Sequence, residues 1–312
     1  MLRFAPRKTI FYSRNTPLQA ASRIQSTRLV LNRTFFVSAT TNSNNDTGIS
    51  GTVKAYQRHI IVCSTRPEHW PSKAEGTSEL TMKLAALART LHGTTVTLSD
   101  INLDAFSQQP HRQSKPDSSK ADTLDVVVYP GGDYVTNLGI NDIDTLVDHF
   151  RKQDEKAGII ARPSRSPQHQ QSKTREGRPL DWNTIPEDHT LMLVCTHGSR
   201  DSRCGEFGGK LLELLREKIE KDKLANSVTA WCTSHIGGHK YAANVIVYPE
   251  GDWYGNLAPE SQTVTKLLSY LKGKDVWWDK WRGRLNCTKV EQKDMYETLC
   301  QCARPDGCKD TK

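Results

Sequence analysis

Four side chains in the second half of this 312-residue sequence have the types and spacing needed for metal chemistry. Cys195 and Cys204 are separated by eight residues, and His235 and His239 flank a stretch that contains a Gly-Gly pair. Two thiolates and two imidazoles suit Zn²⁺ or an iron–sulfur cluster, whereas Mg²⁺ and Ca²⁺ prefer oxygen ligands. The sequence therefore predicts a metal or cluster site at these four residues.

The spacing of the cysteines bears on the choice between zinc and a cluster. Structural zinc usually takes a cysteine pair from a tight turn with about two to four residues between them, and the loop here is wider. A two-iron cluster can accept a cysteine pair on one iron and a histidine pair on the other, as in Rieske centres. Gly237 and Gly238 would let the backbone approach the inorganic sulfides without a Cβ in the way. His197 is a rival ligand, and we expect it instead to hydrogen-bond to the loop or to a sulfide.

The flanking sequence predicts the elements that position these residues. "HTLMLVCTHG" (189–198) predicts a strand that ends near Cys195, and "GGKLLELLREKIEK" (208–221) predicts an amphipathic helix that follows Cys204. "NSVTAWCTS" (226–234) and "ANVIVYPEGDWYG" (243–255) predict two more strands, with His235 and His239 between them. Two loops at the same end of a small sheet can bring the four side chains together.

The first half of the chain predicts a similar order of elements. Strands are expected at 59–65, 94–101 and 124–135, with a helix at 78–93, which is an α/β pattern. Short strings recur in the two halves: "VCST" resembles "VCTH", and "VYPGGDY" resembles "VYPEGDW". The first copy keeps Cys63 but lacks the other three ligands, so we expect it to be a scaffold without a metal site.

The strings "CTHGSRDSRCGEFGGKLLELL" and "SHIGGHKYAANVIVYPEGDWYG" resemble the sucrase/ferredoxin-like family of thioredoxin-like ferredoxins. The resemblance implies an α/β fold of tandem thioredoxin-like domains, the C-terminal one a thioredoxin-like ferredoxin. It also implies a [2Fe–2S] cluster held by Cys195, Cys204, His235 and His239, and a mitochondrial redox role. Four-cysteine relatives have cysteines where this chain has its histidines. The domains are expected at 56–150 and 190–275, with a polar linker at 151–189 and a Cys-rich tail at 276–312.

The histidine pair also predicts a high reduction potential. Neutral imidazoles in place of two thiolates remove negative charge beside the irons, which makes electron uptake easier. His-ligated Rieske clusters lie at about −150 to +300 mV, against about −400 mV for plant-type ferredoxins.

The first 45 residues contain seven of the 43 Lys and Arg residues and none of the 35 Asp and Glu residues. This Arg-, Ser- and Thr-rich composition, without the apolar core of a secretory signal, predicts a mitochondrial transit peptide at 1–45. Its end resembles a matrix-processing site at Arg33, Phe35 and Ser38, which favours the matrix over the intermembrane space. The rest of the chain is nearly neutral, so neither nucleic acid nor membrane insertion is expected.

These features predict an electron carrier or redox sensor that works with an unidentified redox protein partner, rather than a substrate-turnover enzyme. Two alternatives stay open at this point. The first is a thiol–disulfide oxidoreductase that uses cysteines of the tail (Cys287, Cys300, Cys302 and Cys308). The second is a structural zinc module that only binds partners.

Overall fold

The computed structural model of the protein describes residues 48–64, 67–106, 123–159 and 179–302. The expected transit peptide at 1–45 lies outside the described residues. The described residues all belong to one compact unit. No helix in the described part of the chain combines the length and the apolar character that a membrane crossing requires.

The second half contains the expected strands and helix and also a further hairpin strand and helix. Its elements, in chain order, are β6 (Thr190–Cys195), α3 (Gly209–Lys221), β7 (Val228–Thr233), β8 (Val245–Tyr248), β9 (Asp252–Tyr254) and α4 (Ser261–Lys272). Strand β7 is parallel to β6, whereas β8 is antiparallel to β6 and β9 is antiparallel to β8. The strand order across this half is β9-β8-β6-β7.

The first half repeats this topology. Its elements are β1 (Arg58–Cys63), α1 (Glu79–Ala88), β2 (Thr94–Ser99), β3 (Leu124–Tyr129), β4 (Asp133–Leu138) and α2 (Asp142–Lys156). Strand β2 is parallel to β1, and β3 and β4 continue antiparallel on the other side, in the order β2-β1-β3-β4. The strings that recur in the sequence therefore occupy equivalent places in the two halves.

Both halves belong to a single ten-stranded sheet, so separate tandem domains are not confirmed. The halves join where β2 pairs with β7, at the single register position Ser99 opposite Thr233. Short strands extend each outer edge: β5 (Asn183–Thr184) pairs with β4, and β10 (Trp281–Arg284) pairs with β9 and is followed by α5 (Lys289–Cys302).

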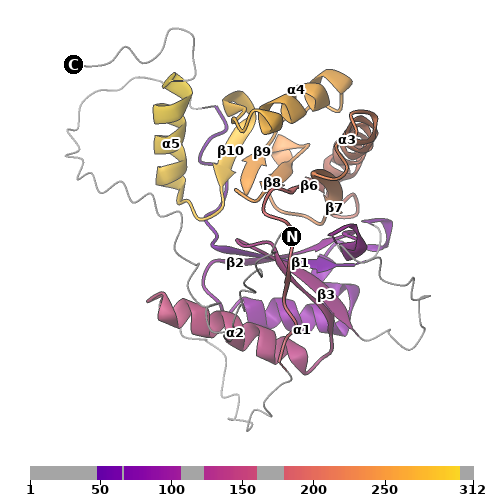
Figure 1. The fold of residues 1–312 in the computed structure, drawn as a ribbon, viewed down its shortest axis with the longest axis vertical. Coiled ribbons are helices and arrows are strands. Elements are labelled where there is room, and N and C mark those ends of the chain that lie inside the picture. Colours follow the sequence, from indigo (N-terminus) through magenta and orange to yellow (C-terminus); the bar gives the residue numbers. More distant parts are fainter. Residues whose placement is uncertain (1–47, 65–66, 107–122, 160–178, 303–312) are drawn as a thin grey trace, which may run out of the picture. The chain divides into compact units, whose positions relative to one another are not determined.

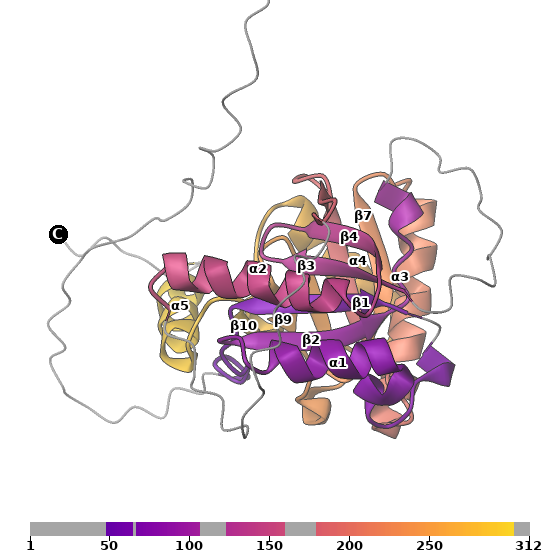
Figure 2. The same cartoon turned by 90° about the horizontal axis from the view of Figure 1, so that it is seen from below.

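The helices of each half cover the outer face of its own strands. Figure 1 shows α1 and α2 on one side of the strands and α3 and α4 on the opposite side, and Figure 2 shows the same elements from below. The inner faces of the two halves meet, because Tyr129 of β3 stacks on Tyr248 of β8 with 3.7 Å between ring centroids. The result is a layered α/β arrangement with one hydrophobic cluster beneath the helices of both halves and a second between the strands.

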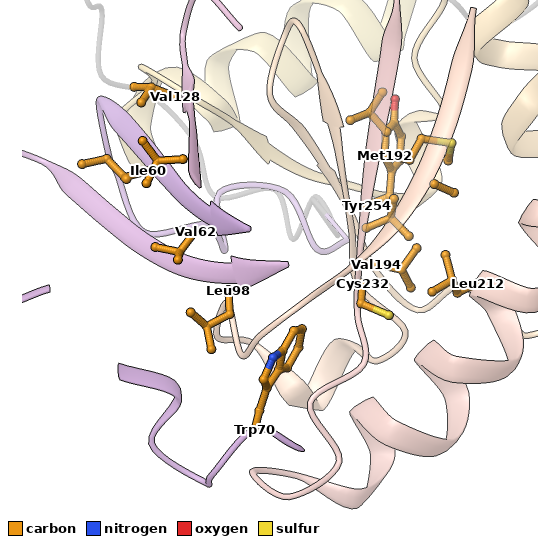
Figure 3. Packing of buried hydrophobic residues seen from close by; sticks show 14 of the residues in the cluster. Ile60, Val62, Trp70, Leu98, Val128, Met192, Val194, Leu212, Cys232 and Tyr254 are labelled. Carbon is orange, nitrogen blue, oxygen red and sulfur yellow. The ribbon is translucent and has the colours of Figure 1, made fainter. Parts of the chain in front are cut away.

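The strands are apolar on both faces, as burial on both sides requires. Ile60 and Val62 of β1 point into the cluster beneath the helices, whereas Ile61 points into the cluster between the halves. Met192 and Val194 of β6 lie in the helix-covered cluster in the same way, and Figure 3 shows them near Leu212. This alternation places the end of β6, and with it Cys195, between two packed layers.

The expected linker does not have the predicted boundaries. Helix α2 continues to Lys156, beyond the expected start at residue 151, and β5 lies before the expected end at residue 189. Charged residues inside α2 made this segment look like a solvated loop, although its buried face contacts the core. Residues 160–178 lie outside the described part of the chain.

A buried polar chain crosses between the two halves. His59 of β1 is fully buried, with Nδ1 2.6 Å from the Tyr248 hydroxyl and Nε2 2.8 Å from Thr97 Oγ1. Trp253 Nε1 donates to the Tyr56 hydroxyl over 2.7 Å, and the Tyr56 ring lies edge-on to the His59 ring with 6.1 Å between centroids. Because these polar groups satisfy one another away from water, they fix how the halves pack.

Burial lowers the pKa of His59 to about 3, which predicts a loss of stability in acid. The unfolded chain binds a proton at His59 below about pH 6.5, whereas the folded protein does not bind one until the pH approaches its own pKa. Between these values the free energy of unfolding should fall as pH falls, by up to about 1.4 kcal/mol per pH unit from this residue.

Urea unfolding at several pH values measures this slope. His59→Gln should have a shallower slope than the wild type, and His69→Gln, at an exposed position, should keep the wild-type slope. Equal slopes in His59→Gln and the wild type would contradict the prediction.

Candidate metal centre

The two cysteines lie at the junction of β6 and α3, as the sequence predicts. Cys195 is the last residue of β6, and Cys204 begins a π-helical turn (Cys204–Gly208) that leads into α3. Each is only 1% exposed. A Cβ on Gly208 would lie 2.0 Å from the Cys195 carbonyl oxygen, so only glycine lets the turn pack this closely on the end of the strand.

The histidines lie on the loop between β7 and β8. His235 follows the end of β7, and its ligand atom lies within 4.8 Å of the Cys195 and Cys204 sulfurs. His239 begins a short 3₁₀ turn (His239–Tyr241) and is 48% exposed. Its ring centroid is 5.6 Å from that of His235, and its Nδ1 is 3.7 Å from Asp201 Oδ2. The structure therefore brings three of the four predicted ligands together and places the fourth at the edge of the group.

The electrostatics of the site favour negative charge on Cys195. A hydrogen bond from Cys204 and backbone N–H groups of His197 and Ile236 lower the pKa of the Cys195 thiol despite its burial. The same hydrogen bond and burial raise the pKa of Cys204, because Cys204 is the donor and must give up its proton to ionise. A cation or an electron-deficient metal would release that remaining proton.

His197 is confirmed as a residue that hydrogen-bonds to the loop. Its Nδ1 accepts the His235 backbone N–H over 3.0 Å, and its Nε2 donates to the Pro71 carbonyl over 2.9 Å. A carbonyl can only accept, so the proton of the neutral ring is on Nε2. Both ring nitrogens are therefore engaged, which removes His197 from the set of rival ligands.

The first half of the chain supports both ligand loops. Ser199, in the cysteine loop, donates to the Trp70 carbonyl over 2.7 Å. Ser234, directly before His235, donates its backbone N–H to the Leu98 carbonyl over 2.8 Å and accepts the Leu98 N–H on its hydroxyl over 2.9 Å. The first half of the chain, which has no ligands, thus stabilises the two loops of the second half that carry them.

Sequence reasoning missed the residues that lie behind the histidine loop. Asn244 donates through Nδ2 to the Gly238 carbonyl over 3.0 Å and accepts from Arg282 Nη1 over 2.7 Å. Gly238 has a φ of 69°, and a Cβ there would lie 2.4 Å from Arg282 Nη2. In the structure, contact with Arg282 therefore accounts for this glycine, whereas the sequence suggested approach to a sulfide. The contact between a buried arginine and the glycine-rich loop has no counterpart in the sequence pattern. It becomes visible only in the folded structure.

The donor set fits an iron–sulfur cluster or zinc. His235 Nδ1 is buried and has no hydrogen-bond partner among the described residues, and an unpaired buried nitrogen is costly unless something absent from the structure binds it. Two sulfurs and imidazole nitrogen are also the ligand types that both metals prefer. The residues present therefore fit the group that the sequence predicts.

The other described cysteines have thiols that are held protonated. Burial raises the pKa of Cys63 and Cys287, and raises that of Cys232 to about 12. Cys195 is the one described cysteine with a lowered pKa. The side chains of Cys300 and Cys302, and all of Cys308, lie outside the described part of the structure.

A cleft of about 590 Å³ opens beside His235. His197 and His235 form part of its wall, and α1, β2 and the segment 72–76 of the first half form the rest. Three cationic side chains, Lys73, Arg89 and Arg200, also line it, and Arg89 pairs with Glu75 over 3.4 Å. The ligand group is thus approachable from a cleft with an excess of positive charge.

A family model described as sucrase/ferredoxin-like matches residues 49–283. Altered inheritance of mitochondria protein 32 of Meyerozyma guilliermondii is 36% identical over 100 residues, which cover 31% of this chain and 35% of that protein. The protein of the same name from Kluyveromyces lactis is 24% identical over 265 residues, covering 75% of this chain and 76% of that protein. In three proteins of this name, that of Meyerozyma guilliermondii among them, the match with this chain covers only 33% to 38% of the relative's own length.

Two further proteins are similar to part of the chain. Actin patches distal protein 1 of Saccharomyces cerevisiae is 29% identical over 99 residues, covering 28% of this chain and 31% of that protein. The solved structure of a thioredoxin-like [2Fe–2S] ferredoxin from Aquifex aeolicus has 21% sequence identity and a TM-score of 0.26, and it covers 31% of this chain and 93% of its own.

The close approach of Gly208 to Cys195 predicts that Gly208→Ala weakens the site. The new methyl group must push the Cys195 backbone away, at a cost of about 1–3 kcal/mol in the free energy of unfolding and with loss of bound metal. Gly209→Ala is the matched control, because a Cβ there meets nothing within 4 Å and the residue is already helical. It should stabilise the protein by up to about 1 kcal/mol.

Urea unfolding and metal analysis of the purified variants measure both effects. The packing argument is wrong if Gly208→Ala retains metal and stability as well as Gly209→Ala does.

Proposed function

The chain belongs to the sucrase/ferredoxin-like family, and from this premise we propose that it holds a [2Fe–2S] cluster and carries single electrons in mitochondria. The observation that carries the proposal is the buried group of Cys195, Cys204 and His235, whose ligand atoms lie within 4.8 Å of one another. His239 would complete the set from the edge of the group. When bound, such a cluster takes up and releases one electron at a time.

The residues of the chain would hold the cluster and tune it. Cys195 and Cys204 supply thiolates, and the backbone N–H groups of His197 and Ile236 stabilise the negative charge on Cys195. His197 fixes the position of His235 through the backbone N–H that it accepts. These contacts hold the ligand loops in place around the site.

The surroundings of the histidines support a role with a redox protein partner. The cysteines are buried, whereas His239 is 48% exposed, so the histidine side is where a partner would come closest. The cleft beside His235 has Lys73 and Arg200 in its wall, and neither forms an ion pair with a described residue. We therefore propose a partner that presents an acidic surface to this side.

A mitochondrial location is supported by the names of two relatives and by the composition of residues 1–45. The matrix is favoured over the intermembrane space, because residues 33–38 resemble a matrix-processing site. Fractionation of mitochondria with protease protection tests the location, and a matrix protein shortened at about residue 38 is the expected result.

The same donor set also suits zinc, so a zinc-binding interaction module is the second candidate function. The wide spacing of the cysteines argues against it, since structural zinc usually takes its cysteines from a tighter turn. A thiol–disulfide oxidoreductase based on Cys287 is disfavoured, because burial raises the pKa of this thiol and its Sγ packs 3.8 Å from Met295 Sδ.

Loss of either cysteine ligand should abolish the cluster. Cys195→Ala and Cys204→Ala remove a thiolate that no neighbouring group replaces, so protein purified anaerobically should lose its iron, its sulfide and its colour. Cys63→Ser is the matched control, because Cys63 occupies the equivalent strand end in the first half, and it should retain iron. Colourless wild-type protein with stoichiometric zinc would end the cluster proposal.

Exchange of a histidine for cysteine should keep the cluster and lower its potential. His235→Cys or His239→Cys adds a thiolate charge that opposes reduction. Spectroelectrochemical titration measures the midpoint potential of each variant against the wild type. An unchanged potential and spectrum in either variant would remove that histidine from the ligand set.

A further inference from the structure

Arg282 of β10 is a buried cation surrounded by neutral groups. The residue is only 2% exposed, and its guanidinium carbon lies 4.5 Å from the ring centroid of Tyr241 and 5.6 Å from that of Trp253. It donates from Nη1 to Asn244 Oδ1 over 2.7 Å and from Nε to Thr52 Oγ1 over 3.1 Å. No described carboxylate forms an ion pair with it. Burial lowers its pKa to about 10, so it stays charged at neutral pH.

The neutral groups around Arg282 do not cancel its charge, and a charge taken out of water without an opposite charge beside it is destabilising. The chain pairs its comparable arginines. Arg284, two residues along the same strand, donates to both carboxylate oxygens of Asp252 over 2.7 and 2.8 Å. Arg58 pairs with Asp154 over 2.7 Å. The contrast indicates that the counter-charge of Arg282 is not a carboxylate.

The guanidinium packs against the loop that carries the histidines. Its Nη2 would be 2.4 Å from a Cβ on Gly238, which lies in the segment that joins His235 to His239. Asn244, which accepts from Arg282, also donates to the Gly238 carbonyl. Burial lowers the pKa of Arg282, and the acidic groups of Tyr241 and Cys195 oppose this effect. Of these two, Cys195 belongs to the ligand group. The anion that Arg282 lacks therefore belongs to the ligand group itself.

We propose that Arg282 is the buried counter-charge of the Cys–His site and raises its reduction potential by stabilising the reduced state. This inference rests on the proposed function. Two thiolates balance the two positive charges of an oxidised [2Fe–2S] core, so the site is neutral until it gains one electron from its redox partner. Reduction leaves one negative charge, and no proton or bond needs to move. A fixed guanidinium in a medium of low dielectric attracts this added charge.

The segment before β1 and helix α5 help to keep water from Arg282. Thr52 accepts from its Nε, and the neighbouring Val53 is buried and accepts through its carbonyl from Gln292 Nε2 of α5 over 3.4 Å. Gly283 lies so close to Gln292 that a Cβ would be 2.2 Å from its Oε1. Strand β10 occupies the same edge position in the second half as β5 does in the first, and the counter-charge gives β10 a function of its own.

The midpoint potential of the purified, cluster-loaded protein tests the proposal. Arg282→Gln should lower the potential by about 59 mV or more, the one-electron equivalent of a tenfold change in the reduction equilibrium. Arg282→Lys keeps the charge and should recover most of the shift. Lys272→Gln, at an exposed position, removes the same charge and should leave the potential unchanged.

A second variant keeps the proposal testable if Arg282→Gln does not fold. Asn244→Asp is nearly isosteric and would place a carboxylate beside Arg282, so it should also lower the potential while the iron and sulfide content stays intact. Potentials of both variants equal to that of Lys272→Gln would overturn the role of Arg282. Wild-type protein without iron would instead overturn the proposed function, so the two failures are distinguishable.

Discussion

Both ring nitrogens of His197 are engaged, and the arrangement of the site depends on these two hydrogen bonds. The ring is fully buried, accepts from the His235 backbone and donates to the Pro71 carbonyl. One side chain thus ties the cysteine loop, the histidine loop and the first half of the chain together. Because a buried imidazole without partners is costly, the three segments hold one another in a single arrangement.

The contact of His197 with Pro71 shows that the first half of the chain has a structural role at the site. It repeats the topology of the second half without its ligands, yet the backbone of Trp70, Pro71 and Leu98 supports both ligand loops. Its β2 joins β7 next to Ser234, so the strand that leads to His235 has a neighbour on each side. A duplicated fold has become one sheet in which one half holds the ligands and the other braces them.

Much of this organisation follows from local sequence patterns. Continuous apolar runs predict β1 and β6, and the spacing of leucines predicts α1 and α3, because these elements are decided by burial within a short stretch. The sequence predicts β3 with β4, and β8 with β9, as single strands, because the tight turn of each hairpin leaves little sequence between its strands. Helix α2 was partly assigned to a linker because its solvent face is highly charged.

The residues of the site divide in the same way into those that local sequence predicts and those that it does not. Cys195 and Cys204 stand out because they flank a strand end and a helix start, and the structure brings them together with His235. Arg282 could not be found in this way, because its role depends on a contact with Gly238, 44 residues earlier in the chain, and on having no ion pair with a carboxylate in the described part of the structure. Long-range electrostatics of this kind leave no periodic signal in a sequence.

The central claim is a cluster held by two cysteines and two histidines, and pulsed EPR and ENDOR of the reduced protein labelled with ¹⁵N-histidine test it most directly. The account predicts an S = 1/2 signal with two strongly coupled histidine nitrogens, one from His235 and one from His239. A spectrum with one coupled nitrogen would remove His239 from the ligands. A spectrum with none would contradict the account.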